Sequence, residues 1–226
     1  HGHANLRGAT LFPHHIGQGC MNDAALVEEL ARLSCRESHA CGINWMFAPC
    51  CTVPDDLRWG RTYEAFSEDP AVVAELAAAE VRGIQTCGVP MAACVKHWVA
   101  DGATALGTGT KDFEWTGAPV GVLDQGDAQI DERELRERHV AAYLPALAAS
   151  GAAAPLTVMV SYSSWNGVKA HASHYLVTTL LKEELGFGGL VVSDFNGVQQ
   201  CCPDDFKTAL ALALNAGIDM VMTAGG

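Results

Sequence analysis

The strongest constraint on the fold is a regular alternation of short apolar segments with longer helical ones. Five runs rich in apolar and β-branched residues recur along the chain, at residues 44–48, 92–99, 158–162, 190–193 and 219–223. Each run is almost continuously hydrophobic, which is the pattern of parallel strands that are buried on both faces. The alternation therefore predicts a parallel α/β protein in which strand–helix–strand units repeat.

The segments between these runs carry helix start and stop signals. Asp69-Pro70 is a capping residue followed by proline in the first turn, and Asp131-x-x-Glu134 resembles a capping box. The expected helices cover residues 24–38 after Asp23, a segment from Pro70 that ends by Gly88, a segment from Asp131 toward Ser150, residues 175–185 after Ser173, and residues 206–215 after Asp204.

Polar residues end nearly every predicted strand. Lys96-His97, Ser161-Tyr162 and Ser193-Asp194 each close an apolar run. In a (β/α)8 barrel the carboxyl ends of the strands form the active-site face, so such residues converge there. An open doubly wound sheet also fits the alternation, but neither a G-x-G-x-x-G motif nor a Walker loop follows an early strand. We therefore predict a TIM-type (β/α)8 barrel, with the irregular stretch 102–129 overhanging the same face.

Composition narrows the classes of partner. The 226 residues include 14 basic and 26 acidic side chains, for a net charge of −12, with 49% hydrophobic and only 18% charged residues. The low charged fraction excludes intrinsic disorder, and the acidic balance argues against nucleic acid and against an anionic membrane surface. The uncharged residues 141–157 contain two prolines and do not read as a membrane span. The nine cysteines are an odd number without paired spacing, which favours mostly free thiols over a disulfide framework or metal cluster.

Asp194 is the sharpest candidate for chemistry. It follows the apolar run 190–193, so its carboxylate is expected at the mouth of a buried strand. A carboxylate in that place can act as a nucleophile, a general base or a metal ligand. Capping of the following helix is the structural alternative, and position alone leaves both open.

Lys96 and His97 lie back to back near the end of an apolar run. Strict strand alternation would send them to opposite faces unless the strand bends at its end. A buried lysine is costly without a charged partner or a polar ligand, which favours a functional role. That role could be hydrogen bonding to a ligand hydroxyl or formation of a Schiff base, as in an aldolase.

Two further groups of residues give weaker evidence for a function. Residues 58–70 combine arginines, aromatic rings and carboxylates, which suits binding of a polyhydroxylated ligand but equally a surface ion-pair network. Several histidines loosely mimic the ligands of a barrel metallohydrolase. They are scattered, with His14-His15 expected in a loop after Pro13, and a structural role is favoured. The scattered histidines are His1, His3, His14, His15, His171 and His174.

Taken together, these segments resemble the N-terminal barrel domain of glycoside hydrolase family 3, which includes β-glucosidases and β-glucan exohydrolases. The resemblance runs in order along almost the whole chain. The matching segments are residues 1–5, 8–14, 47–49 and 56–70, Val95-Lys96-His97-Trp98, Asp101-Gly102, residues 159–167, and 185–187 through Val192-Ser193-Asp194.

The resemblance implies roles for individual residues. Asp194 would be the nucleophile of a retaining mechanism, and Arg61, Lys96 and His97 would bind sugar hydroxyls in the first subsite. Tyr162 matches the family's tyrosine near the nucleophile. The two cations near Asp194 would keep it ionised. Phe195 stands where such members usually have tryptophan and would form an apolar subsite wall.

The resemblance also implies that the 226 residues are part of a barrel, without its first strands, its closing helix and the second domain that supplies the acid/base carboxylate. A histidine on a barrel loop replaces that carboxylate in the family's single-domain N-acetylglucosaminidases, but residues 102–129 contain no histidine. The resemblance implies no metal or cofactor. It implies a secreted, periplasmic or vacuolar location. The expected partners are β-linked glucosides or oligosaccharides.

We therefore predict a retaining, exo-acting β-glucoside or β-glucan hydrolase. One alternative is a catalytically incomplete fragment or carbohydrate-binding remnant. A more distant one is a metal-dependent barrel hydrolase, which would leave the motifs of residues 58–70 and 162–167 unexplained.

Overall fold

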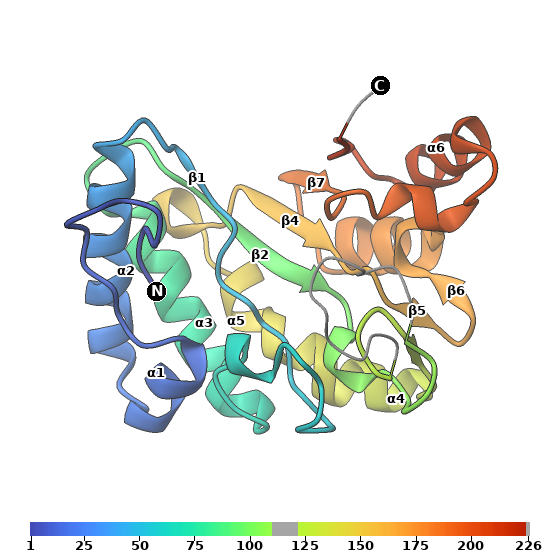
Figure 1. Ribbon diagram of the computed structural model, residues 1–226, viewed down its shortest axis with the longest axis horizontal. Coiled ribbons are helices and arrows are strands. Elements are labelled where there is room, and N and C mark those ends of the chain that lie inside the picture. Colours follow the sequence, from blue (N-terminus) through green and yellow to red (C-terminus); the bar gives the residue numbers. More distant parts are fainter. Residues whose placement is uncertain (110–121, 225–226) are drawn as a thin grey trace.

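Four parallel strands form the centre of the computed structural model, which describes residues 1–109 and 122–224 (Figure 1). The strands are β1 (Trp45–Met46), β2 (Ala92–Trp98), β4 (Thr157–Val160) and β7 (Leu190–Val192), in that spatial order. Each neighbouring pair is parallel. All four fall on predicted runs, and the prediction of a parallel α/β protein is confirmed.

The fifth predicted strand, residues 219–223, is not a strand. Only Met220 forms a bridge, parallel to Val192 of β7. Two residues later the backbone N–H of Met222 donates to the Ser193 hydroxyl instead of a backbone carbonyl, at 2.8 Å, and this contact interrupts the ladder. Across the described residues the main sheet is open, with β1 and β7 as its outer full strands.

Helices cover one face of the sheet (Figure 1). The two longest, α2 (Ala24–His39) and α3 (Pro70–Gln85), pack against each other, and α3 also contacts β2. Their predicted caps are confirmed. Asp23 accepts a hydrogen bond from the backbone of Leu26, and Asp69 accepts one from Ala71. The core between these layers is continuous and includes Val27, Leu76, Ile84, Val95, Val158 and Leu180.

The later helices differ from the prediction in detail. The segment from Asp131 toward Ser150 breaks into α4 (Glu132–Glu134), the π-helical η4 (Leu135–Val140), the 3₁₀ turn η5 (Ala141–Tyr143) and α5 (Leu144–Leu147). Pro145 contributes to this break because it has no backbone N–H to continue the ladder. The last helix, α6 (Phe206–Ala216), is capped by Asp205 and not by Asp204. Its predecessor, η8 (Tyr175–Glu184), is π-helical.

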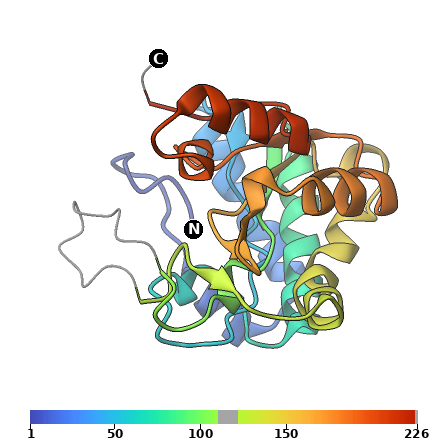
Figure 2. The ribbon, with the colours of Figure 1, turned by 90° about the vertical axis from the view of Figure 1, so that its right-hand side faces the viewer.

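Two elements were not predicted. Helix α1 (His15–Met21) is seven residues long and contains two glycines, so it shows no apolar period. A second sheet joins β3 (Asp127–Ala128), β5 (Ser164–Trp165) and β6 (Val168–Lys169) (Figure 2). Its hairpin turns through Asn166-Gly167, both at positive φ (48° and 83°), as a two-residue turn requires.

Short 3₁₀ turns complete the fold: η1 (Thr62–Glu64), η2 (Asp101–Ala103), η6 (Gly151–Ala153), η7 (Ala170–Ala172) and η9 (Val198–Cys201). Residues 110–121 of the predicted long loop lie outside the described residues. In the part of the chain that the structure describes, no helix is long and apolar enough to cross a membrane.

Candidate active site

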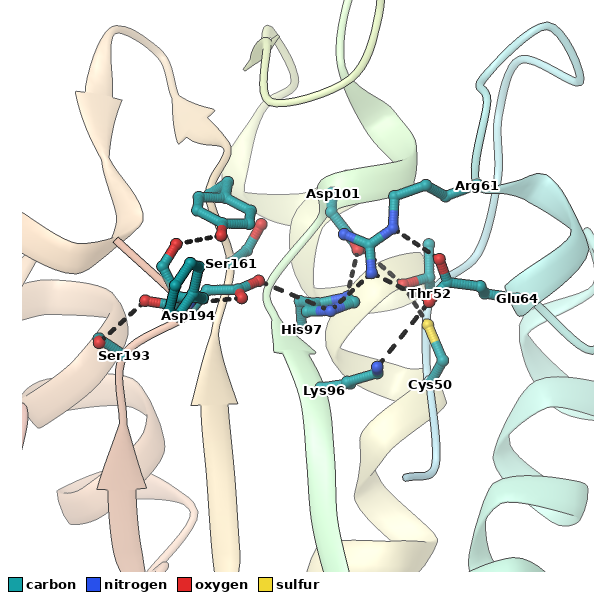
Figure 3. A network of polar contacts seen from close by, with 12 residues as sticks. Cys50, Thr52, Arg61, Glu64, Lys96, His97, Asp101, Ser161, Ser193 and Asp194 are labelled. Atoms are coloured by element: carbon teal, nitrogen blue, oxygen red, sulfur yellow. Dashed lines mark hydrogen bonds and ion pairs between the residues drawn. The ribbon is translucent and has the colours of Figure 1, made fainter. Parts of the chain in front are cut away.

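Polar side chains from several elements meet at the carboxyl edge of the main sheet (Figure 3). Lys96 and His97 lie near the end of β2, and Asp194 follows β7 by two residues. Arg61 and Glu64 reach the same place from η1 and the residue that precedes it. The expectation that the polar strand ends converge is confirmed.

An irregularity in β2 brings Lys96 and His97 into one network. Between Val95 and Trp98, β2 advances three residues while β4 advances two, so the register shifts. Such a bulge changes the direction in which the following side chains point. Both side chains therefore face the polar site of Figure 3, although strict alternation would separate them.

His97 is held between an arginine and a carboxylate. Arg61 Nη2 lies 3.0 Å from His97 Nε2, and Asp101 Oδ2 lies 2.9 Å from Nδ1. Because the guanidinium can only donate, Nε2 accepts, and Nδ1 carries the proton that is donated to Asp101. Burial and the nearby charges of Arg61 and Lys96 hold the pKa of His97 well below its usual value, so the ring is neutral. The other Asp101 oxygen accepts from Thr52, at 2.7 Å.

Asp194 is buried, with only 8% of its surface exposed, and its two carboxylate oxygens differ. Oδ1 accepts a hydrogen bond from the backbone N–H of Phe195 at 2.7 Å. Oδ2 lies 3.7 Å from His97 Nε2, but that nitrogen has no proton to give. The Tyr162 hydroxyl is near enough to lower the pKa of Asp194, but it donates its proton to the Phe195 carbonyl, so Oδ2 has no hydrogen-bond donor among the described residues. Burial raises the pKa of Asp194 to about 6, against the lowering effect of that backbone N–H, Arg61 and Lys96.

This finding refines the expectation that the two cations keep Asp194 ionised. The cations do lower its pKa, but burial outweighs them. A carboxylate with a pKa of about 6 is still mostly ionised at pH 7, and here only its Oδ1 accepts a backbone hydrogen bond.

The pKa of Glu64 is lowered, in contrast to that of Asp194. Its carboxylate makes two contacts with Arg61, at 2.7 and 2.9 Å, and lies 3.8 Å from Lys96 Nζ. Burial alone would raise its pKa, but the hydrogen bond and charge of Arg61, with Lys96 and His97, lower it to about 2. Glu64 is therefore an anion that orients the two cations.

His171 supports the backbone of Asp194. Its Nε2 accepts the Asp194 backbone N–H at 3.0 Å. Burial lowers the pKa of His171 to about 3, so the ring is neutral with its proton on Nδ1. Gly197 packs on the same ring, and a Cβ atom there would lie 2.5 Å from it.

Tyr162 and Phe195 flank the nucleophile candidate. The Tyr162 hydroxyl donates to the backbone carbonyl of Phe195, and burial with the charge of Asp194 raises the Tyr162 pKa. Phe195 is 48% exposed, as an apolar wall facing a ligand would be. On the side of Arg61, Glu64 and Lys96, these three residues line a cavity of about 420 Å³. The cavity is also lined by the rings of Phe47 and Tyr63 and by three histidines, His1, His14 and His15.

One buried trio has the spacing of metal ligands. Cys50, His97 and Asp101 each place a ligand atom within 4.8 Å of the others. Both ring nitrogens of His97 and both oxygens of Asp101 already have hydrogen-bond partners, and burial raises the pKa of the Cys50 thiol to about 12. Thiolate is the form that binds metals, so the trio fits a hydrogen-bond chain better than a cation site.

The comparison with known families now decides the relationship. The signature of the glycosyl hydrolase family 3 N-terminal domain matches residues 1–225. The chain belongs to this family. Among curated relatives, the lysosomal β-glucosidase of Dictyostelium discoideum is 31% identical over 236 aligned residues, which include 98% of this chain but 27% of that protein.

Solved structures of the family superpose closely. A mutant of the exo-1,3/1,4-β-glucanase ExoP from a Pseudoalteromonas species is 40% identical with a TM-score of 0.83, over 98% of this chain and 34% of that one. The β-glucosidase from Listeria innocua in complex with glucose is 29% identical with a TM-score of 0.82, over 94% and 28%. The chain thus spans between a quarter and a third of the length of these relatives.

The structure brings the predicted site residues together. Arg61, Lys96, His97 and Asp194 lie in one network, with Tyr162 and Phe195 beside it. The site residues without a predicted role are Thr52, Glu64 and Asp101. His171 was expected as a scattered histidine with a structural role, and its contact with the Asp194 backbone agrees with that expectation. Glu64 and Asp101 lie in the family-like motifs, and the spacing Arg61-x-x-Glu64 is a signal for an ion pair. His171 carries no local signal, because its contact spans 23 residues.

The predicted loop position of His14-His15 is right for His14 and wrong for His15. His14 precedes α1 as its N-cap residue with non-helical backbone, and His15 is the first residue of the helix. His15 is bound to Glu80 and the backbone of Glu64, which the local sequence around Pro13 cannot show.

Proposed function

We propose that this chain carries the nucleophile of a retaining, exo-acting β-glucoside or β-glucan hydrolase. The observation that supports this most is the buried Asp194 Oδ2, which has no hydrogen-bond donor among the described residues. A buried oxygen without a partner is costly, so it is expected at a place where the ligand completes its environment.

In this proposal Asp194 attacks the anomeric carbon of the sugar as the glycosidic bond breaks. The transition state resembles an oxocarbenium ion, and the product is a covalent glycosyl-enzyme that water then hydrolyses. Arg61, Lys96 and neutral His97 bind the sugar hydroxyls, and Phe195 packs on an apolar part of the substrate. Tyr162 fixes the backbone just after the nucleophile.

We further propose that the open sheet is an arc of a (β/α)8 barrel, and that the general acid comes from another domain of the same polypeptide. The resemblance to the family and the greater length of the relatives support this. Glucose as the sugar in the first subsite is supported by the Listeria innocua enzyme, solved with glucose and, as a mutant, with laminaribiose.

The test uses an activated aryl β-glucoside, because a good leaving group needs little acid assistance. We expect a burst of aryl alcohol equal to the enzyme concentration. With the 2-deoxy-2-fluoro derivative, we expect an adduct that peptide mass spectrometry assigns to Asp194. The absence of both burst and adduct would refute catalysis by this chain.

The same experiment separates the alternatives. A chain that binds glucose but forms no adduct behaves as the carbohydrate-binding remnant. Loss of activity on chelation, with stoichiometric zinc in the protein, would support the metal-dependent hydrolase instead.

A further inference from the structure

Glu80 is a buried charge in the interior of α3, outside the network of Figure 3. Only 10% of its side chain is exposed, and its Oε2 lies 2.9 Å from His15 Nε2. That oxygen makes no aligned hydrogen bond with any described residue. A buried carboxylate requires compensation, and here the nearest is the ring of His15.

Both neighbours of the His15 ring are hydrogen-bond acceptors. Its Nδ1 lies 2.7 Å from the backbone carbonyl oxygen of Glu64, which can only accept, so Nδ1 must donate. Its Nε2 lies 2.9 Å from the Glu80 carboxylate, which also accepts. Burial would raise the pKa of Glu80, but its contact with His15 lowers it below its usual value. The ring is therefore held from both sides, by α3 through Glu80 and by η1 through Glu64.

His15 is also fixed in orientation. Its ring stacks on Phe66 with a centroid distance of 4.2 Å and an interplanar angle of 14°. One turn further along α1, Gly19 lies so close to the Phe66 backbone that a Cβ atom would approach the carbonyl oxygen to 1.7 Å. Helix α1 therefore packs closely against the segment that follows η1.

The contact with Glu64 links His15 to the candidate active site. The Glu64 carbonyl belongs to η1, a three-residue turn that has little stability of its own. The carboxylate of the same residue binds Arg61 and faces Lys96. A displacement of η1 would therefore move the anion that orients both cations.

We propose that His15, held by Glu80, is a positioning residue that sets η1 and, through Glu64, the sugar-binding geometry of Arg61 and Lys96. The proposal rests on the proposed function for its consequence in sugar binding, but not for its structural part. Within the described residues, the polar contacts of His15 reach Glu80 and the Glu64 backbone, and Glu64 is the member of the network through which it acts, although His15 also lines the cavity beside Arg61 and Lys96.

The first test measures the two contacts of the His15 ring. In the wild-type chain, ¹⁵N NMR of the histidine rings should show the Nδ1–H of His15 in a hydrogen bond, and Glu80→Gln should shift the Nε2 signal. An Nε2 signal that is unmoved in folded Glu80→Gln would overturn the proposal.

The second test follows Arg61 directly. The Nε–H signal of Arg61 should shift in His15→Gln and in Glu80→Gln. It should stay in place in Glu28→Gln, a matched control that breaks the α2–α3 ion pair with Arg82. The double variant His15→Gln/Glu80→Gln pairs two neutral amides and should restore part of the wild-type position. An Arg61 signal unmoved in folded His15→Gln would refute the positioning role. If neither single variant folds, the double variant is the test. A wild-type Arg61 signal in the double variant would show that the pair is purely structural, and this result would refute the positioning role.

The third test reads the functional consequence with glucose as the probe. Calorimetry should give about threefold weaker binding in His15→Gln, equal to about 0.7 kcal/mol, and unchanged binding in Glu28→Gln. Wild-type-like glucose affinity in His15→Gln together with a shifted Arg61 signal would overturn the link to sugar binding. An absence of binding in the wild type would count against the proposed function, and the two NMR tests would then decide the positioning role of His15.

Discussion

Asp194 and Glu64 are two carboxylates of one site in opposite environments. Glu64 is engaged by Arg61 at two oxygens and lies near Lys96, and its pKa is lowered to about 2. Asp194 has one oxygen without a donor among the described residues, and burial raises its pKa to about 6. The same two cations act on both groups, so the difference comes from hydrogen bonding and burial and not from the charges alone.

The contrast separates a positioning role from a reactive one. A carboxylate whose lone pairs are occupied by donors is stable but a poor nucleophile. One that is dehydrated and only half satisfied is less stable and more reactive, which is the usual trade-off at active sites. The effects of substitutions at the two positions should therefore differ in which property changes, reaction rate or ligand binding, as well as in size.

The largest expected effect is on formation of the covalent intermediate. Asp194→Asn should reduce the rate of adduct formation by about 10⁴-fold or more, because it removes the attacking oxygen. Glu64→Gln should retain the adduct. Rapid-mixing kinetics with an activated aryl β-glucoside measure both variants, and an adduct that persists in Asp194→Asn would show that another residue is the nucleophile.

The second effect is on stability, and its sign differs between the two carboxylates. The folded-state pKa of Asp194 is raised from 3.8 to about 6, so the stability cost of its ionisation builds up between these two pH values and is complete above pH 6. Asp194→Asn should therefore be more stable at pH 7 by up to about 3 kcal/mol. The folded-state pKa of Glu64 is lowered, so its contribution is present above its unfolded pKa and is lost only as the pH falls toward 2. Glu64→Gln should be less stable at pH 7 by up to about 3 kcal/mol, because that pair is mostly buried.

Denaturant unfolding of both variants at two pH values provides the control. At pH 5 the gain in Asp194→Asn should fall to about half its value at pH 7, because the wild-type carboxyl is then mostly protonated in the folded state. The loss in Glu64→Gln should be nearly unchanged. Equal signs for the two variants would contradict the comparison.

A third effect concerns the support of Asp194 by His171. Gly197→Ala places a Cβ atom 2.5 Å from the His171 ring, so the ring or the Asp194 backbone must shift. We expect a loss of about 1–3 kcal/mol in stability and about a tenfold slower adduct formation, at 1.4 kcal/mol per factor of ten. Gly188→Ala is the matched control, since nothing lies within 4 Å of its Cβ position. A Gly197→Ala enzyme with the kinetics of that control would show that His171 does not support the nucleophile.

The smallest effect is on substrate affinity. Glu64→Gln keeps a hydrogen bond to Arg61 but loses the charge that attracts Arg61 and Lys96. Glucose binding should weaken by a factor of about three to ten, or about 1 kcal/mol, with a smaller change in the rate of adduct formation. Calorimetry beside the burst kinetics measures the two quantities, and a change confined to the rate would place Glu64 in the chemistry itself.

The sequence predicted what depends on local pattern. The four strands and the caps Asp23 and Asp69 follow from apolar runs and capping residues. The convergence of Lys96 and Asp194 follows from parallel topology, because strand ends of one direction share an edge. Their chemical roles came from the family resemblance and remain predictions.

Features that depend on distant contacts or on local irregularity could not be predicted in the same way. The bulge in β2 that turns both Lys96 and His97 into the site has no sequence signal. The contacts from His171 to Asp194 and from Glu80 to His15 join residues 23 and 65 positions apart, so they exist only after the fold has formed. The Asp194 Oδ2 atom without a donor likewise reflects burial by several elements at once.

The most direct test of the division between the two carboxylates is their titration by ¹³C NMR in the wild-type chain. We predict that Asp194 titrates near pH 6 while Glu64 stays ionised to about pH 2. If both groups titrate together in the ordinary range for exposed acids, the site does not separate a reactive carboxylate from a positioning one, and the central claim is wrong.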